Sequence, residues 1–466
     1  MAITRRRFVF ALAGGMGMSL ATAVGRAVQE GRELPKPLPR QLAWQECEVG
    51  AIYHFDIPVY LPGGWQWQPA YTQTLDPKVY NPRKLDTDQW LAAAKALGAR
   101  YALFTATHMG GFLQWQSDLY PYGVKQSPWR GGKGDIVGDF VKSCRRVGIK
   151  PGLYIGLRFN AYWKVARQRV NFGRGGDPQK QEQYNRLCER MVTELCTRYG
   201  ELVEIWFDGG TLCPAEGGPD ILPIVEKHQP NAVFYHSDER SEHRWIGNES
   251  GIAGYPCWAT VPSIEAIRHG VRGQPRRDIL AHGDPEGKLW SPAMCDAPLR
   301  NHSWCWRPNE ERKVRPLSAL LNMYYKSVGR NCNLILGVVV DRDGLVPKPD
   351  FERCVEFGKE ISRRFAQPIA QTRGRGMTIE LPLGGEKEVD HAIIMEDVAQ
   401  GERIRKYVLE GLAGNEWREI CRGLSVGHKR IEQFAPVRVS ALRLRCTAAV
   451  AEPIIRKLAV YYVGAG

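Results

Sequence analysis

The chain has 466 residues, of which 43% are hydrophobic and 24% charged, and its formal net charge is +14. This composition is that of a globular protein with two or three domains and excludes a disordered or fibrous chain. The positive charge is dispersed and follows no nucleic-acid-binding motif, so we expect no nucleic-acid partner and at most a weak attraction to anionic polymers such as sulfated glycans.

The N-terminus predicts an export signal. Three arginines at positions 5–7 precede a glycine- and alanine-rich apolar run over residues 9–24, which is typical of a twin-arginine signal and too short to span a membrane. A chance basic N-terminus is the alternative interpretation. We expect a signal peptide over residues 1–28, a linker over residues 29–40, and an exported, periplasmic or extracellular protein that is not inserted in a membrane.

The cysteines and histidines follow no metal-binding pattern. The chain contains 12 cysteines and 10 histidines, which are scattered without the spacing of a metal site. We therefore expect no metal and no other cofactor. The disulfide status and the oligomeric state are left open.

Strands and helices alternate between residues 49 and 365. Strands are predicted at 49–56, 101–106, 151–156, 202–207, 232–235 and 329–337, and helices at 85–97, 135–147, 178–199 and 351–365. This alternation is typical of a parallel α/β fold, and polar and aromatic residues follow the strand ends, which favours a TIM-type (β/α)8 barrel over residues 41–366. A doubly wound nucleotide-binding fold would need a glycine fingerprint after the first strand, and none is present.

The texture of the sequence changes after residue 366. Short runs of alternating apolar and polar residues, such as 377–381 and 437–444, are separated by turns. This pattern predicts an antiparallel β-sandwich over residues 367–466.

One carboxylate stands at the end of a predicted strand. Asp208 follows Trp206 and Phe207 and precedes Gly209 and Gly210. Glycines allow a sharp turn and a close approach to a ligand, and a carboxylate beside an indole can attack or stabilise the anomeric carbon of a sugar. The alternative interpretation is that Asp208 only caps the turn.

Several long motifs resemble the α-L-fucosidases of glycoside hydrolase family 29, and most closely the subgroup that acts on α-1,3 and α-1,4 fucosides. The resemblance runs from about Val49 to the C-terminus and implies a (β/α) barrel followed by a discoidin-like β-sandwich. The matching segments are 127–135, 206–209 (Trp-Phe-Asp-Gly), 244–249 (Arg-Trp-Ile-Gly-Asn-Glu), 327–332, 404–407, 427–431 and 459–462.

The resemblance also implies a retaining hydrolysis with two carboxyl groups about 5 Å apart. Asp208 matches the nucleophile of the family and Glu249 the general acid/base. We expect the neighbouring aromatic residues Trp245 and Tyr255 to raise the pKa of Glu249, so that it begins the reaction protonated. A surface-loop carboxylate is the alternative interpretation of Glu249.

Six further residues are implied to bind the sugar: His54, Trp67, His108, Met109, Tyr154 and Trp206. The sequence departs from the family in this pocket. Met109 and Gly110 stand where the family usually has a second histidine and an aspartate, and an acidic residue expected near Trp65 is missing. Met294 stands where relatives tend to have glutamate.

Three interpretations of these departures remain open. The chain can be a fucosidase in which other loops supply the lost contacts, or a retaining exo-glycosidase for a modified or related sugar, such as sulfated or methylated fucose or L-galactose. The third interpretation is a non-catalytic carbohydrate-binding protein, against which the presence of both Asp208 and Glu249 argues. The expected partner is a fucosylated or related glycan. Trp304 and Trp306 are expected either to line the mouth of the site or to lie in the core.

Overall fold

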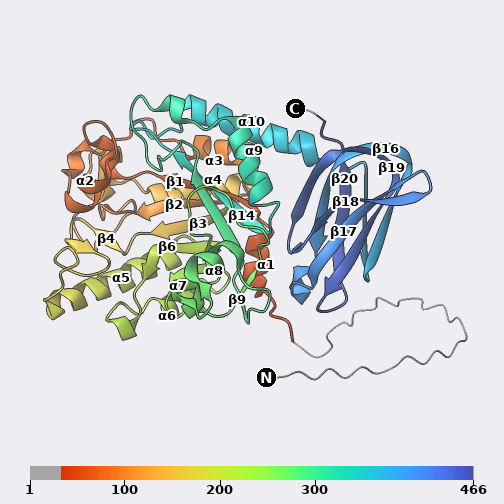
Figure 1. The fold of residues 1–466 in the computed structure, drawn as a ribbon. Coiled ribbons are helices and arrows are strands. Elements are labelled where there is room, and N and C mark those ends of the chain that lie inside the picture. The colour runs from red at the N-terminus through yellow and green to blue at the C-terminus, as the bar shows by residue number, and fades with distance from the viewer. Residues whose placement is uncertain (1–32, 465–466) are drawn as a thin grey trace, which may run out of the picture.

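The computed structural model describes residues 33–464 and shows two domains, a barrel followed by an antiparallel β domain (Figure 1). The predicted signal peptide lies outside the described residues. The barrel domain ends with helix α10, Lys348–Phe365, and the second domain begins with strand β15, Ala370–Arg375. Within residues 33–464, no helix combines the length and the apolar character needed to cross a membrane.

Eight parallel strands form the barrel in the order β7-β6-β3-β2-β1-β14-β13-β8. They are β1 Val49–His54, β2 Tyr101–Thr107, β3 Lys150–Ile155, β6 Glu204–Thr211, β7 Val233–Ser237, β8 Arg244–Trp245, β13 Ala293–Pro298 and β14 Cys332–Val339. The ring is not fully closed, because β7 and β8 do not pair as strands. The segment before β8 joins them, since its Glu242 amide donates to the Phe234 carbonyl at 3.1 Å. The predicted barrel is confirmed.

The helices of the barrel pack outside the strands (Figure 1). They are α3 Thr87–Leu97, α4 Ile136–Val147, α5 Pro178–Arg198, α6 Leu222–His228, α7 Ile264–His269, α8 Arg276–His282, α9 Leu317–Lys326 and α10. Asp86, Asp135 and Asp177 begin α3, α4 and α5, where their carboxylates accept backbone N–H groups that have no partner within the helix. Trp90 and Leu91 of α3 are fully buried, as the predicted apolar face requires.

Short elements complete the barrel domain. They are the helices α1 Pro39–Gln45 and α2 Trp67–Thr72 and the strand pairs β4 Phe159–Asn160 with β5 Val165–Ala166, β9 Thr260–Val261 with β12 Leu289–Trp290, and β10 Gly270–Val271 with β11 Gln274–Pro275. The prediction that the linker extends to residue 40 is wrong, because α1 already begins at Pro39. The proline fits the first turn of the helix, where its missing N–H costs no hydrogen bond.

Helix α1 closes the N-terminal end of the barrel through Trp44. The indole is fully buried and its Nε1 donates to Oε2 of Glu204 at 2.8 Å. The other carboxylate oxygen of Glu204 lies 2.7 Å from Nε2 of His243, whose ring stacks on Trp44 with 4.6 Å between centroids. A buried carboxylate is thereby partnered on both oxygens, as burial of a charged group requires.

The second domain is one six-stranded antiparallel sheet in the order β15-β20-β16-β19-β17-β18. Besides β15, its strands are β16 Thr378–Glu396, β17 Ile404–Ala413, β18 Glu416–Gly423, β19 Arg430–Ala449 and β20 Ile454–Tyr461. The pairing of the two long strands is irregular between Pro382 and Lys387, and buried side chains from both halves, including Leu381 and Ile394, share one core. The predicted antiparallel domain is confirmed, with its layers made from one folded sheet.

The two domains meet at the start of β14, around Asn331. This residue has a left-handed backbone (φ 64°), its amide donates to the Lys429 carbonyl at 2.9 Å, and its Oδ1 accepts the His428 amide at 2.7 Å. Nearby, Glu402 of the second domain accepts the Ala259 amide at 2.9 Å. The contact is therefore built from specific buried hydrogen bonds.

Candidate active site

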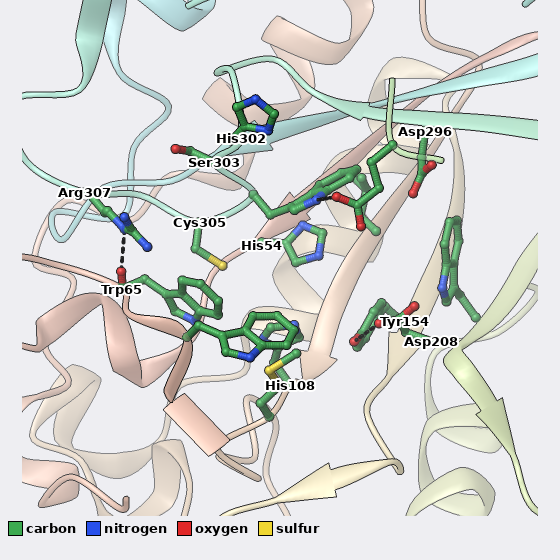
Figure 2. A pocket seen from close by; sticks show the side chains of 16 residues that line it. His54, Trp65, His108, Tyr154, Asp208, Asp296, His302, Ser303, Cys305 and Arg307 are labelled. Atoms are coloured by element: carbon green, nitrogen blue, oxygen red, sulfur yellow. Dashed lines mark hydrogen bonds between the residues drawn. The ribbon is translucent and has the colours of Figure 1, made fainter. Parts of the chain in front are cut away.

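A cavity of about 350 Å³ opens at the C-terminal ends of the barrel strands (Figure 2). It is large enough for a monosaccharide and lies at the end of the barrel where active sites are built. The cavity is lined by Ile52, His54, Trp65, Trp67, His108, Met109, Tyr154, Trp206, Asp208, Glu249, Asp296, His302, Ser303, Trp304, Cys305 and Arg307. All eight residues predicted as catalytic or sugar-binding are among them.

Asp208 sits in β6 at the point where two glycines continue the chain. A Cβ atom on Gly209 would lie 2.7 Å from Cδ of Arg158, and one on Gly210 would lie 2.8 Å from the ring of His236. Both glycines also have positive φ values, a conformation that favours glycine. The Gly-Gly pair thus allows the strand end and its carboxylate to lie between Arg158 and His236.

The groups around Asp208 shift its pKa in opposite directions. Loss of solvent within the crowded pocket raises its pKa, whereas the Tyr154 hydroxyl, which donates to Oδ2 at 3.3 Å, lowers it. The negative charge of Glu249 raises the pKa further and the guanidinium of Arg158 lowers it. The net pKa is above the ordinary value for aspartate.

Glu249 lies in the loop that follows β8 and is exposed to solvent. Its Oε2 accepts a hydrogen bond from the indole Nε1 of Trp304 at 2.8 Å. The expectation that Tyr255 flanks this carboxylate is wrong, because the Tyr255 hydroxyl accepts the Leu424 amide at 2.8 Å and its ring packs against the second domain. The raised pKa expected for Glu249 stays a prediction.

Asp296 is a third carboxylate on the pocket wall. It is 7% exposed, and its Oδ1 accepts the indole Nε1 of Trp245 at 2.7 Å. Burial raises its pKa well above the ordinary value, and the charges of Glu249 and Asp208 act in the same direction. Asp296 was not predicted. Side chains two apart share one face of a strand, so Asp296 lies on the same face of β13 as Met294, which the sequence singled out. Met294 is fully buried within the barrel, and Asp296 lies closer to the pocket.

Two histidines form the floor of the pocket. The rings of His54, at the end of β1, and His108, after β2, lie edge to face with 5.4 Å between centroids. Burial lowers the pKa of His54 well below its ordinary value and that of His108 to about 4, so both imidazoles are neutral at pH 7. The Nδ1 atoms of both rings are buried without a hydrogen-bond partner among the described residues.

Two indole N–H groups in the pocket wall also have no partner among the described residues. They belong to Trp65, which is 8% exposed, and Trp206, which is 5% exposed. A buried donor without a partner costs about 1–3 kcal/mol, so these groups point to a polar ligand that satisfies them. Trp67 differs, because 56% of it is exposed at the rim.

The loop after β13 supplies one wall that the sequence did not predict. Its pocket residues are His302, Ser303, Trp304, Cys305 and Arg307. Trp304, left open between mouth and core, lines the pocket, whereas Trp306 is absent from the lining and packs 5.3 Å below the guanidinium of Arg342. No regular element follows β13 at this point, so neither periodicity nor strand position marked these residues.

Asp56 lies behind the loop that carries Met109 and Gly110. It is 1% exposed, its Oδ1 accepts the Ile57 amide at 2.7 Å, and its Oδ2 has no partner among the described residues. A Cβ atom at position 110 would lie 3.4 Å from that Oδ2. Burial raises the pKa of Asp56 to about 7. The absence of a side chain at position 110 therefore coincides with a carboxylate supplied from the segment that follows β1.

The described residues include no group of three or more histidine, cysteine or acidic side chains arranged to hold a metal ion. What the pocket does provide is two solvent-accessible carboxylates, Asp208 and Glu249, on different strand ends, with indoles and neutral imidazoles between them. A barrel with paired carboxylates, aromatic walls and a monosaccharide-sized cavity is the arrangement of a glycoside hydrolase.

Comparison with known proteins agrees with this class. The profile of the Alpha-L-fucosidase family matches residues 44–363. Alpha-L-fucosidase 1 of Arabidopsis thaliana is 30% identical, and the alignment covers 92% of this chain and 88% of the plant protein. A crystal structure of a "putative alpha-L-fucosidase" from Bacteroides thetaiotaomicron is 46% identical with a TM-score of 0.89, covering 93% of this chain and 100% of the other.

A glycoside hydrolase 29 family member from an unknown rumen bacterium has the same fold, with 29% identity and a TM-score of 0.78. That match covers 93% of this chain and 78% of the rumen protein. The chain therefore belongs to the alpha-L-fucosidase family and is a glycoside hydrolase.

Proposed function

We propose that this α-L-fucosidase works by a retaining double displacement, with Asp208 as nucleophile and Glu249 as general acid/base. Asp208 attacks the anomeric carbon while Glu249 protonates the leaving oxygen, and Glu249 then takes a proton from the water that releases the sugar. The observation that carries this proposal is that both carboxylates open on one cavity. Each also has one oxygen oriented by a neighbouring donor, Tyr154 for Asp208 and Trp304 for Glu249.

The sugar is held by groups of both hydrogen-bonding types. The neutral imidazoles of His54 and His108 can each donate through one nitrogen and accept through the other. The Nε1 group of Trp206 donates, and the apolar wall beside Met109 faces the less polar side of the sugar ring. Asp56 places a buried carboxylate beside position 110, where the family usually has an aspartate, but its side chain does not line the cavity.

The substrate and the location of the enzyme rest on the sequence. The similarity to the subgroup that acts on branched glycans favours terminal fucose in α-1,3 or α-1,4 linkage. The arginine-rich N-terminus favours an exported, periplasmic or extracellular enzyme.

Hydrolysis of an aryl α-L-fucoside tests the mechanism. We expect Asp208→Ala to abolish turnover and Glu249→Ala to reduce it by about 10²–10⁴-fold on a substrate with a poor leaving group. On an aryl fucoside with a good leaving group, where release of the sugar from Asp208 limits the rate, azide should restore activity to the Glu249 variant, and proton NMR should show α-fucose as the first product of the unchanged enzyme. Asp220→Ala, an exposed carboxylate outside the pocket lining, is the matched control. An inverted product, or full activity of the Asp208 variant, would contradict the assignment.

A further inference from the structure

Two of the acidic side chains of the pocket lie on the side opposite its arginine. In Figure 2, Asp208 and Asp296 lie on one side of the cavity, and Arg307, Cys305 and Trp65 lie on the other. Of the latter three side chains, Arg307 carries a positive charge and none is acidic. A pyranose that places its anomeric carbon at Asp208 therefore directs its opposite ring carbons toward a cationic wall.

Arg307 is held in place but keeps hydrogen-bonding capacity. Its Nε donates to the backbone carbonyl of Trp65 at 2.7 Å, whereas Nη2 has no hydrogen bond to any described residue. The nearest acidic side chain is Glu310, whose Oε1 lies 3.9 Å from Nη1. Glu310 is already paired, because it accepts from Lys313 at 2.6 Å and from Ser303 at 2.9 Å. The charge of Arg307 is thus only partly balanced by the protein.

The Trp65 indole adds a second donor to this wall. Trp65 is 8% exposed and lines the cavity, and its Nε1 has no partner among the described residues. The backbone bond from Arg307 ties the two side chains together. A guanidinium beside an N–H donor suits an oxyanion, because arginine donates several parallel hydrogen bonds to the oxygens of a tetrahedral or planar anion.

We propose that Arg307 and Trp65 form a subsite for an ester sulfate on the fucosyl residue, carried at O3 or O4. These oxygens lie across the ring from the anomeric carbon, so the sulfate is kept away from the carboxylates that would repel it. The subsite rests on the proposed function, since Asp208 sets the orientation of the sugar. Of the departures in this pocket, the missing acidic residue near Trp65 agrees with the subsite, because a carboxylate there would repel the sulfate.

Turnover of aryl α-L-fucosides that carry no substituent, a 3-sulfate, a 4-sulfate or a 4-O-methyl group tests the subsite. We expect kcat/KM for one sulfated substrate to exceed that of the unsubstituted one by about tenfold or more. Raising the salt concentration should reduce this preference. In Arg307→Gln the sulfated-to-unsubstituted ratio should fall about tenfold or more, and Arg307→Lys should retain part of it.

Arg312→Gln removes the same charge from an exposed position of the same loop and should leave the ratio unchanged. Turnover of the unsubstituted but of neither sulfated substrate would leave the fucosidase mechanism standing and overturn the subsite, as would an unchanged ratio in Arg307→Gln. If no substrate is hydrolysed, calorimetry on Asp208→Asn decides. Tighter binding of fucose sulfate than of fucose, lost in the added Arg307→Gln change, supports the subsite, and equal binding overturns it.

Discussion

Asp208 is placed between groups that drive its ionisation in opposite directions. Loss of solvent raises its pKa and the Tyr154 hydroxyl lowers it. A nucleophilic carboxylate must be ionised, so activity is lost as the pH falls through this raised pKa. The acid limb of the pH profile therefore reports directly on the surroundings of one side chain.

Replacement of Tyr154 by phenylalanine should move that acid limb to higher pH. Without the hydroxyl, the groups that raise the pKa of Asp208 are opposed only by weaker ones, so the pKa rises. A larger share of Asp208 is then protonated at mildly acidic pH. On the neutral plateau we expect kcat/KM to fall by about two- to tenfold. The measurement is kcat/KM against pH, with the exposed Tyr162→Phe as control. A limb that stays in place or moves to lower pH would contradict this account.

The sequence predicted the pocket well where residues follow strand ends. His54, His108 and Asp208 could be placed because the C-terminal ends of barrel strands converge on one opening. Asp296 and Arg307 were missed for different reasons. Asp296 lies within β13, a strand that was not predicted, and Arg307 lies in an irregular loop whose path depends on contacts with the backbone of Trp65.

At the scale of elements, the main surprise is α1. A proline-rich stretch gives no apolar period of a helix, so residues 39–45 were assigned partly to a linker. The helix is stabilised by tertiary contacts, above all by the buried Trp44 and its bond to Glu204. Strand β8 was equally hidden, since two residues are too few to show an alternating pattern.

Trp44→Ala should destabilise the protein by about 3–5 kcal/mol, because it leaves a large cavity and removes the indole partner of a buried carboxylate. Urea unfolding of the mature chain measures this change. Trp67→Ala is the matched control: its side chain is 56% exposed, and we expect a loss of stability below about 1 kcal/mol. Equal destabilisation by both variants would show that the packing of α1 against the barrel does not stabilise the protein.

At the scale of the whole molecule, the second domain is fastened to the end of the barrel opposite the pocket. The bonds at Asn331 precede the first residue of β14, whereas the pocket lies beyond the C-terminal strand ends. This separation predicts that contacts between the domains govern stability without setting the chemistry.

Asn331→Ala tests that separation. The change removes the partner of the His428 amide and of the Cys257 carbonyl, each of which is buried, and we expect a loss of about 2–4 kcal/mol. KM and kcat for an aryl fucoside should stay within about twofold, a small effect on the kinetic free-energy scale. Asn309→Ala, at an exposed position that also has positive φ, controls for the backbone conformation. A large rise in KM for Asn331→Ala would instead couple the domain contact to the pocket.

The break in the barrel sheet between β7 and β8, which do not pair with each other, is a place where such an enzyme can change in length. An insertion between another neighbouring pair of barrel strands risks breaking several ladder hydrogen bonds. Chain added between β7 and β8 meets no strand ladder, only the few backbone bonds of the segment before β8, such as that from the Glu242 amide to the Phe234 carbonyl. The loop that carries Glu249 directly follows β8, one of the two strands at this break. Length variation among relatives is therefore expected to gather here, and a library intended to accept new leaving groups is best built by extending this loop.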